Sequence, residues 1–180
     1  KRTASLGELM SEIANYRQIF NLEGRTAIVT GGSRGIGKAL AEGLAAHGAD
    51  VAIVVKSTVE RAEAVAKDIR AAGRKALVIK ADVSNEADTN RVAEEVVAAW
   101  GRIDILVNLA GRATKKRFEE TDEATWNTMI ARNLTAAFLC SRQFLPLLKK
   151  SAGASIINHA SIDGFLGNPS LAAYSAGKGG

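Results

Sequence analysis

Short apolar runs alternate with longer segments of mixed polarity from residue 26 to the end of the chain. The runs at residues 26–29, 51–55, 76–79, 103–107 and 155–158 predict β-strands, and the fully apolar run at 51–55 is typical of a central parallel strand. The segments at residues 38–47, 59–72, 86–100 and 123–150 predict helices. Strands that alternate with helices favour an α/β fold, in which a doubly wound parallel sheet carries helices on both faces.

The first 21 residues precede this alternation. Their apolar side chains recur at steps of three and four residues, which predicts an amphipathic helix; these side chains are Leu6, Leu9, Ile13, Tyr16 and Phe20. We therefore divide the chain into a helical extension, residues 1–21, and one α/β domain, residues 22–180. Because the chain starts at Lys1 and stops at Gly180, we expect the C-terminal part of the domain to be missing.

Composition excludes several classes of protein. The 180 residues are 47% hydrophobic and carry a net charge of +5, but the basic residues are spread over several helices, which does not favour nucleic-acid binding. No apolar run approaches the roughly 20 residues that a membrane span needs. Cys140 is the only cysteine, which favours a cytoplasmic protein with this thiol in the core. No metal site is expected.

A glycine loop follows the first predicted strand. Its sequence is Thr30-Gly31-Gly32-Ser33-Arg34-Gly35-Ile36-Gly37, and a helical pattern begins behind it. A strand, a glycine loop and a helix N-terminus together form the geometry that binds the pyrophosphate of a dinucleotide. Gly31 permits the tight turn, Gly35 lets the backbone approach the phosphates, and Gly37 permits close packing of the helix.

The end of the second strand indicates which dinucleotide is bound. Proteins that bind NAD place Asp or Glu there to accept from the ribose 2′-hydroxyl. This chain has Val55 followed by Lys56, and Arg34 in the glycine loop is a second cation. NADP is therefore favoured, with NAD still possible, although Lys56 could also be a solvated loop residue.

Three residues near the end of the chain have acid/base chemistry. Tyr174 and Lys178 stand four residues apart, so on a helix they share one face. A phenol is a weak acid with an ordinary pKa of about 10, and a neighbouring ammonium stabilises its anion. Ser161 can supply a hydroxyl that holds a substrate oxygen.

Together these motifs resemble the short-chain dehydrogenase/reductase family. Its TGxxxGxG loop matches residues 30–37, and its NNAG motif appears as Asn108-Leu109-Ala110-Gly111. Its YxxxK motif matches residues 174–178, and its catalytic serine and asparagine match Ser161 and Asn133. The resemblance implies a Rossmann-type domain over residues 22–180.

The resemblance also implies roles for individual residues. Tyr174 would exchange a proton with the substrate oxygen, Lys178 would support the tyrosine and bind ribose, and Ser161 would orient the substrate. Asn133 would hold a water that connects Lys178 to solvent. The cofactor-binding residues would be Gly31, Ser33, Arg34, Gly35, Ile36, Gly37, Lys56, Asp82, Val83, Asn108, Ala110, Gly111, Tyr174 and Lys178.

The function that follows is hydride transfer between NADP(H) and a carbonyl or secondary-alcohol substrate. A 3-oxoacyl-thioester reductase and a sugar or polyol dehydrogenase both fit. The alternative is a catalytically silent NADP-sensing or scaffold protein of the same fold. The partners would be a small-molecule substrate and copies of the chain, in a homodimer or homotetramer. The basic run that starts at Arg112 either attracts an anionic substrate or is a solvated loop.

Overall fold

The computed structural model describes residues 5, 7, 10 and 19–180. The strands are β1 (Thr26–Thr30), β2 (Asp50–Val55), β3 (Ala76–Lys80), β4 (Ile105–Asn108) and β5 (Ser155–Asn158). The longer helices are α2 (Gly35–Ala46), α3 (Val59–Ala71), α4 (Glu86–Trp100), α5 (Glu123–Ile130), α6 (Ala136–Leu148) and α7 (Ala172–Gly179). The helix expected over residues 1–21 lies mostly outside the described residues, so this division of the chain stays a prediction.

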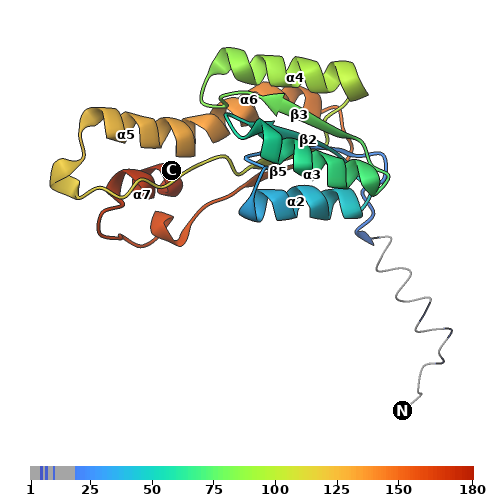
Figure 1. The fold of residues 1–180 in the computed structure, drawn as a ribbon, viewed down its shortest axis with the longest axis horizontal. Helices are drawn as coiled ribbons and strands as arrows, with labels where there is room; N and C mark the ends of the chain where they lie inside the picture. The colour runs from blue at the N-terminus through green and yellow to red at the C-terminus, as the bar shows by residue number, and fades with distance from the viewer. Residues whose placement is uncertain (1–4, 6, 8–9, 11–18) are drawn as a thin grey trace.

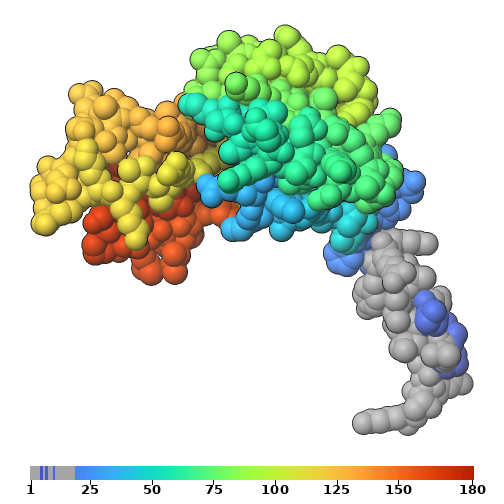
Figure 2. All heavy atoms as spheres, viewed as in Figure 1, coloured from blue at the N-terminus to red at the C-terminus, as the bar shows by residue number. Residues whose placement is uncertain are grey.

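The five strands form one parallel sheet in the order β3-β2-β1-β4-β5. The order reverses between β1 and β4, as expected for a doubly wound sheet, and the predicted Rossmann-like fold is confirmed. Helices α2 and α3 cover one face and α4 and α6 cover the other (Figure 1). Helices α5 and α7 gather at one end of the molecule, beyond these four helices (Figure 2).

Neighbouring residues of the strands β1 to β4 pack into two separate apolar layers. In β1, Ala27 and Val29 pack with α2 and α3, whereas Ile28 packs with α4 and α6. A strand that is buried on both sides must be apolar at every position, which is why the central strands read as continuous apolar runs. Cys140 is fully buried in the second layer, and burial raises the pKa of its thiol to about 12. This cysteine is a core residue, as expected.

The structure corrects three boundaries. Helix α2 begins at Gly35 and not at residue 38, because its first turn is built from the glycine loop itself. Strand β4 begins at Ile105, two residues later than predicted, because Asp104 turns its side chain into a polar cluster. The helix expected over residues 123–150 contains a π-helical segment, η2 (Ala131–Thr135), between α5 and α6.

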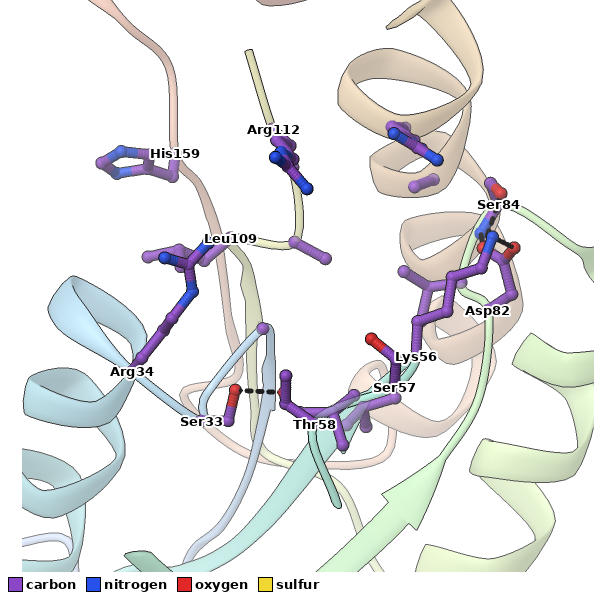
Figure 3. Close-up of a pocket in the computed structure, with 18 of the residues that line it drawn as sticks. Ser33, Arg34, Lys56, Ser57, Thr58, Asp82, Ser84, Leu109, Arg112 and His159 are labelled. Atoms are coloured by element: carbon purple, nitrogen blue, oxygen red, sulfur yellow. Dashed lines mark hydrogen bonds and ion pairs between the residues drawn. The ribbon is translucent and has the colours of Figure 1, made fainter. Parts of the chain in front are cut away.

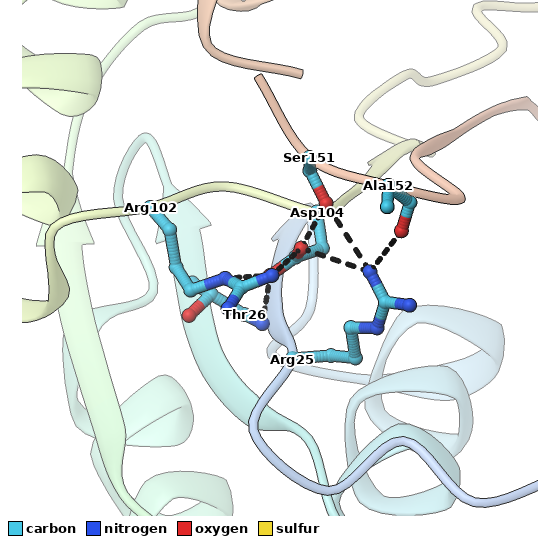
Figure 4. Close-up of polar contacts among 6 residues, drawn as sticks. All are labelled: Arg25, Thr26, Arg102, Asp104, Ser151 and Ala152. Carbon is cyan, nitrogen blue, oxygen red and sulfur yellow. Dashed lines mark hydrogen bonds and ion pairs between the residues drawn. The ribbon is translucent and has the colours of Figure 1, made fainter. Parts of the chain in front are cut away.

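Asp104 is the centre of a polar cluster at the amino ends of the strands (Figure 4). Its fully buried carboxylate accepts hydrogen bonds from the backbone N–H of Thr26 at 2.8 Å and from Arg102 Nη2 at 2.6 Å. Arg25 and Ser151 also donate to it. These contacts join β1, β4 and the segment before β5. Burial alone would raise the pKa of Asp104, but the donors outweigh it and hold the pKa at about 2.

In the part of the chain that the structure describes, no helix has both the length and the apolarity to cross a lipid bilayer. The same residues contain no group of three or more His, Cys, Asp or Glu side chains that could hold a metal ion.

Candidate active site

A cleft of about 940 Å³ opens at the carboxyl ends of the strands. Loops behind all five strands line it (Figure 3). Helix α7 contributes two further lining residues, Tyr174 and Lys178. In doubly wound folds, ligands bind at the switch point of the strand order, which here lies between β1 and β4. The cleft is therefore at the place where the topology puts a ligand.

The glycine loop forms the floor of the cleft. Arg34 is the N-cap of α2, but its side chain makes no capping hydrogen bond and the first turn holds no acidic residue. Gly35 has a φ of +53°, which favours glycine, and a β-carbon there would meet nothing within 4 Å, so the space beside the loop is open. A β-carbon on Gly37 would lie 2.3 Å from the carbonyl oxygen of Gly31, so α2 can pack against the loop only with glycine. This cradle fits the pyrophosphate of a dinucleotide.

Side-chain hydroxyls fasten the glycine loop to its neighbours. Thr30 Oγ1 accepts from the backbone N–H groups of Leu109 and Ala110, both at 3.0 Å. Ser33 Oγ lies 2.7 Å from Thr58 Oγ1, within hydrogen-bond distance. These contacts connect the loops behind β1, β2 and β4, so the floor of the cleft is fixed from three sides.

Lys56 and Asp82 face each other at one end of the cleft (Figure 3). The sequence suggested that both residues bind the cofactor, whereas here Lys56 Nζ donates to Asp82 Oδ2. Ser84 donates to the other carboxylate oxygen through its hydroxyl at 2.6 Å and its N–H at 3.1 Å. Burial would raise the pKa of Asp82, but these bonds outweigh it and lower that pKa. Val83 lines the same end.

Tyr174 and Lys178 both lie on α7 and both line the cleft, so they share a face as predicted. Lys178 Nζ donates a hydrogen bond of 2.6 Å to the carbonyl oxygen of His159, directly behind β5. Burial lowers the pKa of Lys178. The bond to His159 therefore fixes the ammonium at the end of the cleft that α7 forms.

Asn133 lies in the π-helical segment η2 and is buried. Its amide nitrogen donates to the carbonyl oxygens of Met129 at 3.0 Å and Arg112 at 3.2 Å, and its Oδ1 accepts from the N–H of Arg112 at 3.2 Å. A π-helical turn leaves a carbonyl without its usual partner, and here the amide serves that carbonyl. The side chain thereby joins the helix to the loop behind β4.

Gly111 brings Asn133 and Lys178 together. A β-carbon on Gly111 would lie 2.6 Å from Asn133 Oδ1 and 3.6 Å from Lys178 Nζ. The two side chains therefore converge on one point of the backbone, which only glycine leaves open. The sequence suggested that Asn133 holds a water that connects Lys178 to solvent, and this role stays a prediction.

Ser161 and Asn108 do not line the cleft. Ser161 Oγ accepts from the N–H of Asp163 at 3.2 Å and donates to its Oδ2 at 3.3 Å, so its hydroxyl faces Asp163 and not Tyr174. Asn108 is buried and donates to Asn158 Oδ1 at 2.9 Å, and so joins β4 to β5. The Asn108 side chain therefore connects two strands, and its expected place among the cofactor-binding residues stays a prediction.

Most of the other residues expected at the cofactor line the cleft, and one of them, Gly37, does not. The cleft is lined by Gly31, Ser33, Arg34, Gly35, Ile36, Lys56, Asp82, Val83, Ala110 and Gly111. Gly37 lies behind this surface. Sequence reasoning missed Thr58, Arg61 and Arg132, which also line the cleft. The sequence places Arg132 directly before the expected site residue Asn133. It does not show that the Arg132 side chain lines the cleft, because that depends on the direction of the side chain.

The fold and the cleft define a Rossmann-like α/β protein with a glycine loop behind its first strand and a Tyr–Lys pair across from it. The chain belongs to the short chain dehydrogenase family, whose model matches residues 25–180. It is similar to the 3-oxoacyl-(acyl-carrier-protein) reductases of Staphylococcus epidermidis, 36% identical over 87% of this chain, and of Synechocystis, 38% identical over 88%. In both cases the chain spans 64% of the relative's length.

Solved structures agree with this assignment. A dehydrogenase/reductase from Sinorhizobium meliloti has a TM-score of 0.88 and 38% identity, over 92% of this chain and 66% of that one. A variant of a short-chain dehydrogenase/reductase from Serratia marcescens has a TM-score of 0.83 and 36% identity, over 88% of this chain and 64% of that one.

Proposed function

We propose that the protein is an NADP(H)-dependent oxidoreductase that interconverts a carbonyl compound and its secondary alcohol. The observation that carries this proposal is the position of Tyr174 and Lys178. Both side chains open from one face of α7 onto the cleft whose floor is the uncapped N-terminus of α2. A proton-transfer pair and an anion cradle in one cleft are what a dinucleotide-dependent redox enzyme requires.

In the proposed reaction, each of these residues has a separate role. When bound, the nicotinamide supplies or accepts the hydride. Tyr174 gives its phenolic proton to the substrate oxygen during reduction and recovers it during oxidation. Lys178, fixed by the carbonyl of His159, stabilises the phenolate that remains. Asn133 holds the backbone of Arg112 and, with it, the wall beside Lys178.

Ser161 would orient the substrate oxygen, but its hydroxyl is bonded to Asp163 in this structure. Rotation about one side-chain bond would release it. Asp163 is in turn held by Asn168 Nδ2, at 3.0 Å from its Oδ1, so the carboxylate remains satisfied when Ser161 turns away.

NADP is preferred to NAD in this proposal because Lys56, and no unpaired carboxylate, follows β2 at the place where a ribose 2′-phosphate would bind. Lys56 is 61% exposed, so a 2′-phosphate can join it while it stays bonded to Asp82. Arg34 extends into the same cleft (Figure 3).

The names of the curated relatives favour a 3-oxoacyl thioester as the substrate, with a sugar or polyol as the second candidate. We also propose a cytoplasmic homodimer or homotetramer. Exposed apolar side chains on α5 and α6 support subunit pairing there; these are Trp126, Phe138 and Leu145.

The test is the Tyr174→Phe variant, assayed by NADPH consumption with acetoacetyl-CoA and with a panel of ketoses. The phenyl ring keeps the packing and removes only the exchangeable proton, so we expect turnover to fall by at least about 10²-fold. NADPH affinity should stay within about twofold of the parent protein. The matched control is Lys149→Ala, an exposed lysine at the end of α6, which should leave both quantities unchanged. Near-normal turnover in Tyr174→Phe would refute the assignment of the proton donor.

A further inference from the structure

The charges that line the cleft are strongly unbalanced. Among the described residues, the lining holds six permanent cations and a single carboxylate, Asp82, which is already paired with Lys56. The cations are Arg34, Lys56, Arg61, Arg112, Arg132 and Lys178. A cleft of this charge attracts an anionic ligand, and the question is which cations serve which anionic group.

Three of the cations belong to the glycine-loop side. Arg34 precedes α2, Lys56 follows β2, and Arg61 lies in the first turns of α3. This is the side where the proposed function puts the phosphates of the dinucleotide. Arg112 and Arg132 come from the opposite wall, from the loop behind β4 and from the π-helical segment η2.

The Asn133 contacts hold these two arginines together. Asn133 bonds both the N–H and the carbonyl of Arg112, and Arg132 is its neighbour in sequence. The two side chains therefore start from adjacent points of the wall. Figure 3 shows Arg112 at the end of the cleft near His159, whereas Lys56 and Asp82 occupy the other end. His159 is the residue whose carbonyl holds Lys178, so Arg112 lies at the end where proton transfer is proposed.

Two residues of the basic run behind β4 pair with carboxylates outside the cleft, whereas Lys115, which also lies outside it, forms no ion pair with the described residues. Lys116 pairs with Asp122 at 2.7 Å, and Arg117 pairs with Glu119 at 2.5 Å, both on the outer surface. Within the part of the chain described, Arg112 has no such carboxylate partner, and neither has the half-buried Arg132. An anion bound in the cleft would supply the counter-charge that both guanidinium groups lack.

We propose that Arg112 and Arg132 form a specificity site for an anionic group, a carboxylate or phosphate, that the substrate carries close to its reacting carbonyl. This inference rests on the proposed function and adds the substrate class. Guanidinium groups are suited to it because their planar donors match the two oxygens of a carboxylate or phosphate.

The experiment compares pairs of related carbonyl compounds in which only one member carries an anionic group. The full chain, saturated with NADPH, is assayed with acetoacetate against methyl acetoacetate and with dihydroxyacetone phosphate against dihydroxyacetone. The parent protein should prefer the charged member of at least one pair. Arg112→Gln and Arg132→Gln should raise KM for that member by about 10- to 100-fold, since each removes a charge-assisted contact, and should leave the neutral member unchanged.

A matched control and a binding measurement complete the design. Arg117→Gln removes an arginine from the same loop outside the cleft and should change neither KM. Calorimetric titration of acetoacetate and of dihydroxyacetone phosphate into the protein saturated with NADP⁺ gives a readout without turnover, and Arg112→Gln should weaken the binding of the preferred anion by the same factor.

The outcomes separate the two proposals. Equal losses for charged and neutral substrates, or no anion binding by calorimetry, would overturn the specificity site even if carbonyl reduction proceeds. A loss of NADPH affinity in Arg112→Gln as large as the loss of anion affinity would assign the arginine to the cofactor and overturn it too. Absence of NADPH consumption with every carbonyl compound would refute the proposed function, and the titration would still decide the anion site.

Discussion

The contacts of Asp104 allow a quantitative prediction of the stability that is lost when its carboxylate is replaced. Its carboxylate is fully buried and accepts from Arg102, Arg25, Ser151 and the N–H of Thr26. Asp104→Asn keeps the size of the side chain but replaces one accepting oxygen by an NH₂ group. That group faces the arginine donors, so the variant both loses the charge and sets donors against donors.

The magnitude follows from the pKa. In the folded protein the pKa of Asp104 is lowered from 3.8 to about 2, and this difference corresponds to about 2 kcal/mol of stability at neutral pH. Breaking a buried ion pair typically costs about 3–5 kcal/mol, but Arg25 and Arg102 are partly exposed and water can solvate them. We therefore expect a loss of about 2–4 kcal/mol, or a decrease in Tm of about 4–16 °C for a domain of this length.

The pH dependence has a defined sign. Because folding depresses the pKa, the stabilisation is complete above the unfolded pKa near 4 and is lost as pH falls through about 2. Urea unfolding monitored by circular dichroism should show the parent and Asp104→Asn far apart at pH 7 and nearly coincident at the acid end. The control is Asp68→Asn on the exposed face of α3. A gap no larger than that of the control, or one that is independent of pH, would refute the reasoning.

Two further predictions concern the cofactor side of the cleft. Gly37→Ala puts a β-carbon 2.3 Å from a loop carbonyl oxygen, so it should lower the free energy of urea unfolding by about 1–3 kcal/mol and weaken NADPH binding. The control is Gly43→Ala in the same helix, which has open space around its β-carbon and should be neutral or stabilising. Lys56→Ala and Arg34→Ala should weaken NADPH binding more than NADH binding in titrations, with the exposed Lys67→Ala as control; equal losses for both cofactors would contradict the preference for NADP.

The sequence was sufficient for the parts of the fold that local patterns determine. Strand β5 and helix α4 have the predicted limits, because an apolar run or a capped helix ends where its composition changes. Asn85 caps α4 by accepting from the N–H of Asp88 at 3.1 Å, as its residue type suggested. The glycine loop was also recognisable, since its function needs glycine at fixed spacing.

Features that arise from contacts between distant segments could not be predicted. The π-helical segment contains Asn133, which bonds the backbone of Arg112, 21 residues earlier, and nothing in the local pattern signals this contact. The Lys56–Asp82 pair likewise joins the loops behind β2 and β3, which only the strand order makes neighbours. Each residue had been assigned separately to the cofactor, because a sequence shows what a side chain can bind but not which partner lies nearest.

The same contacts explain why the cleft has two walls with different properties. On the glycine-loop side, backbone N–H groups and the Ser33–Thr58 pair form a surface that does not depend on long side chains. On the other side, a single buried amide, Asn133, fixes the backbone from which Arg112 extends and converges with Lys178 at Gly111. A group that every member of the family must bind is suited to the first wall, because main-chain geometry changes little with sequence. The second wall presents variable side chains from a fixed backbone, which lets substitutions change the substrate without disturbing the Tyr174–Lys178 pair.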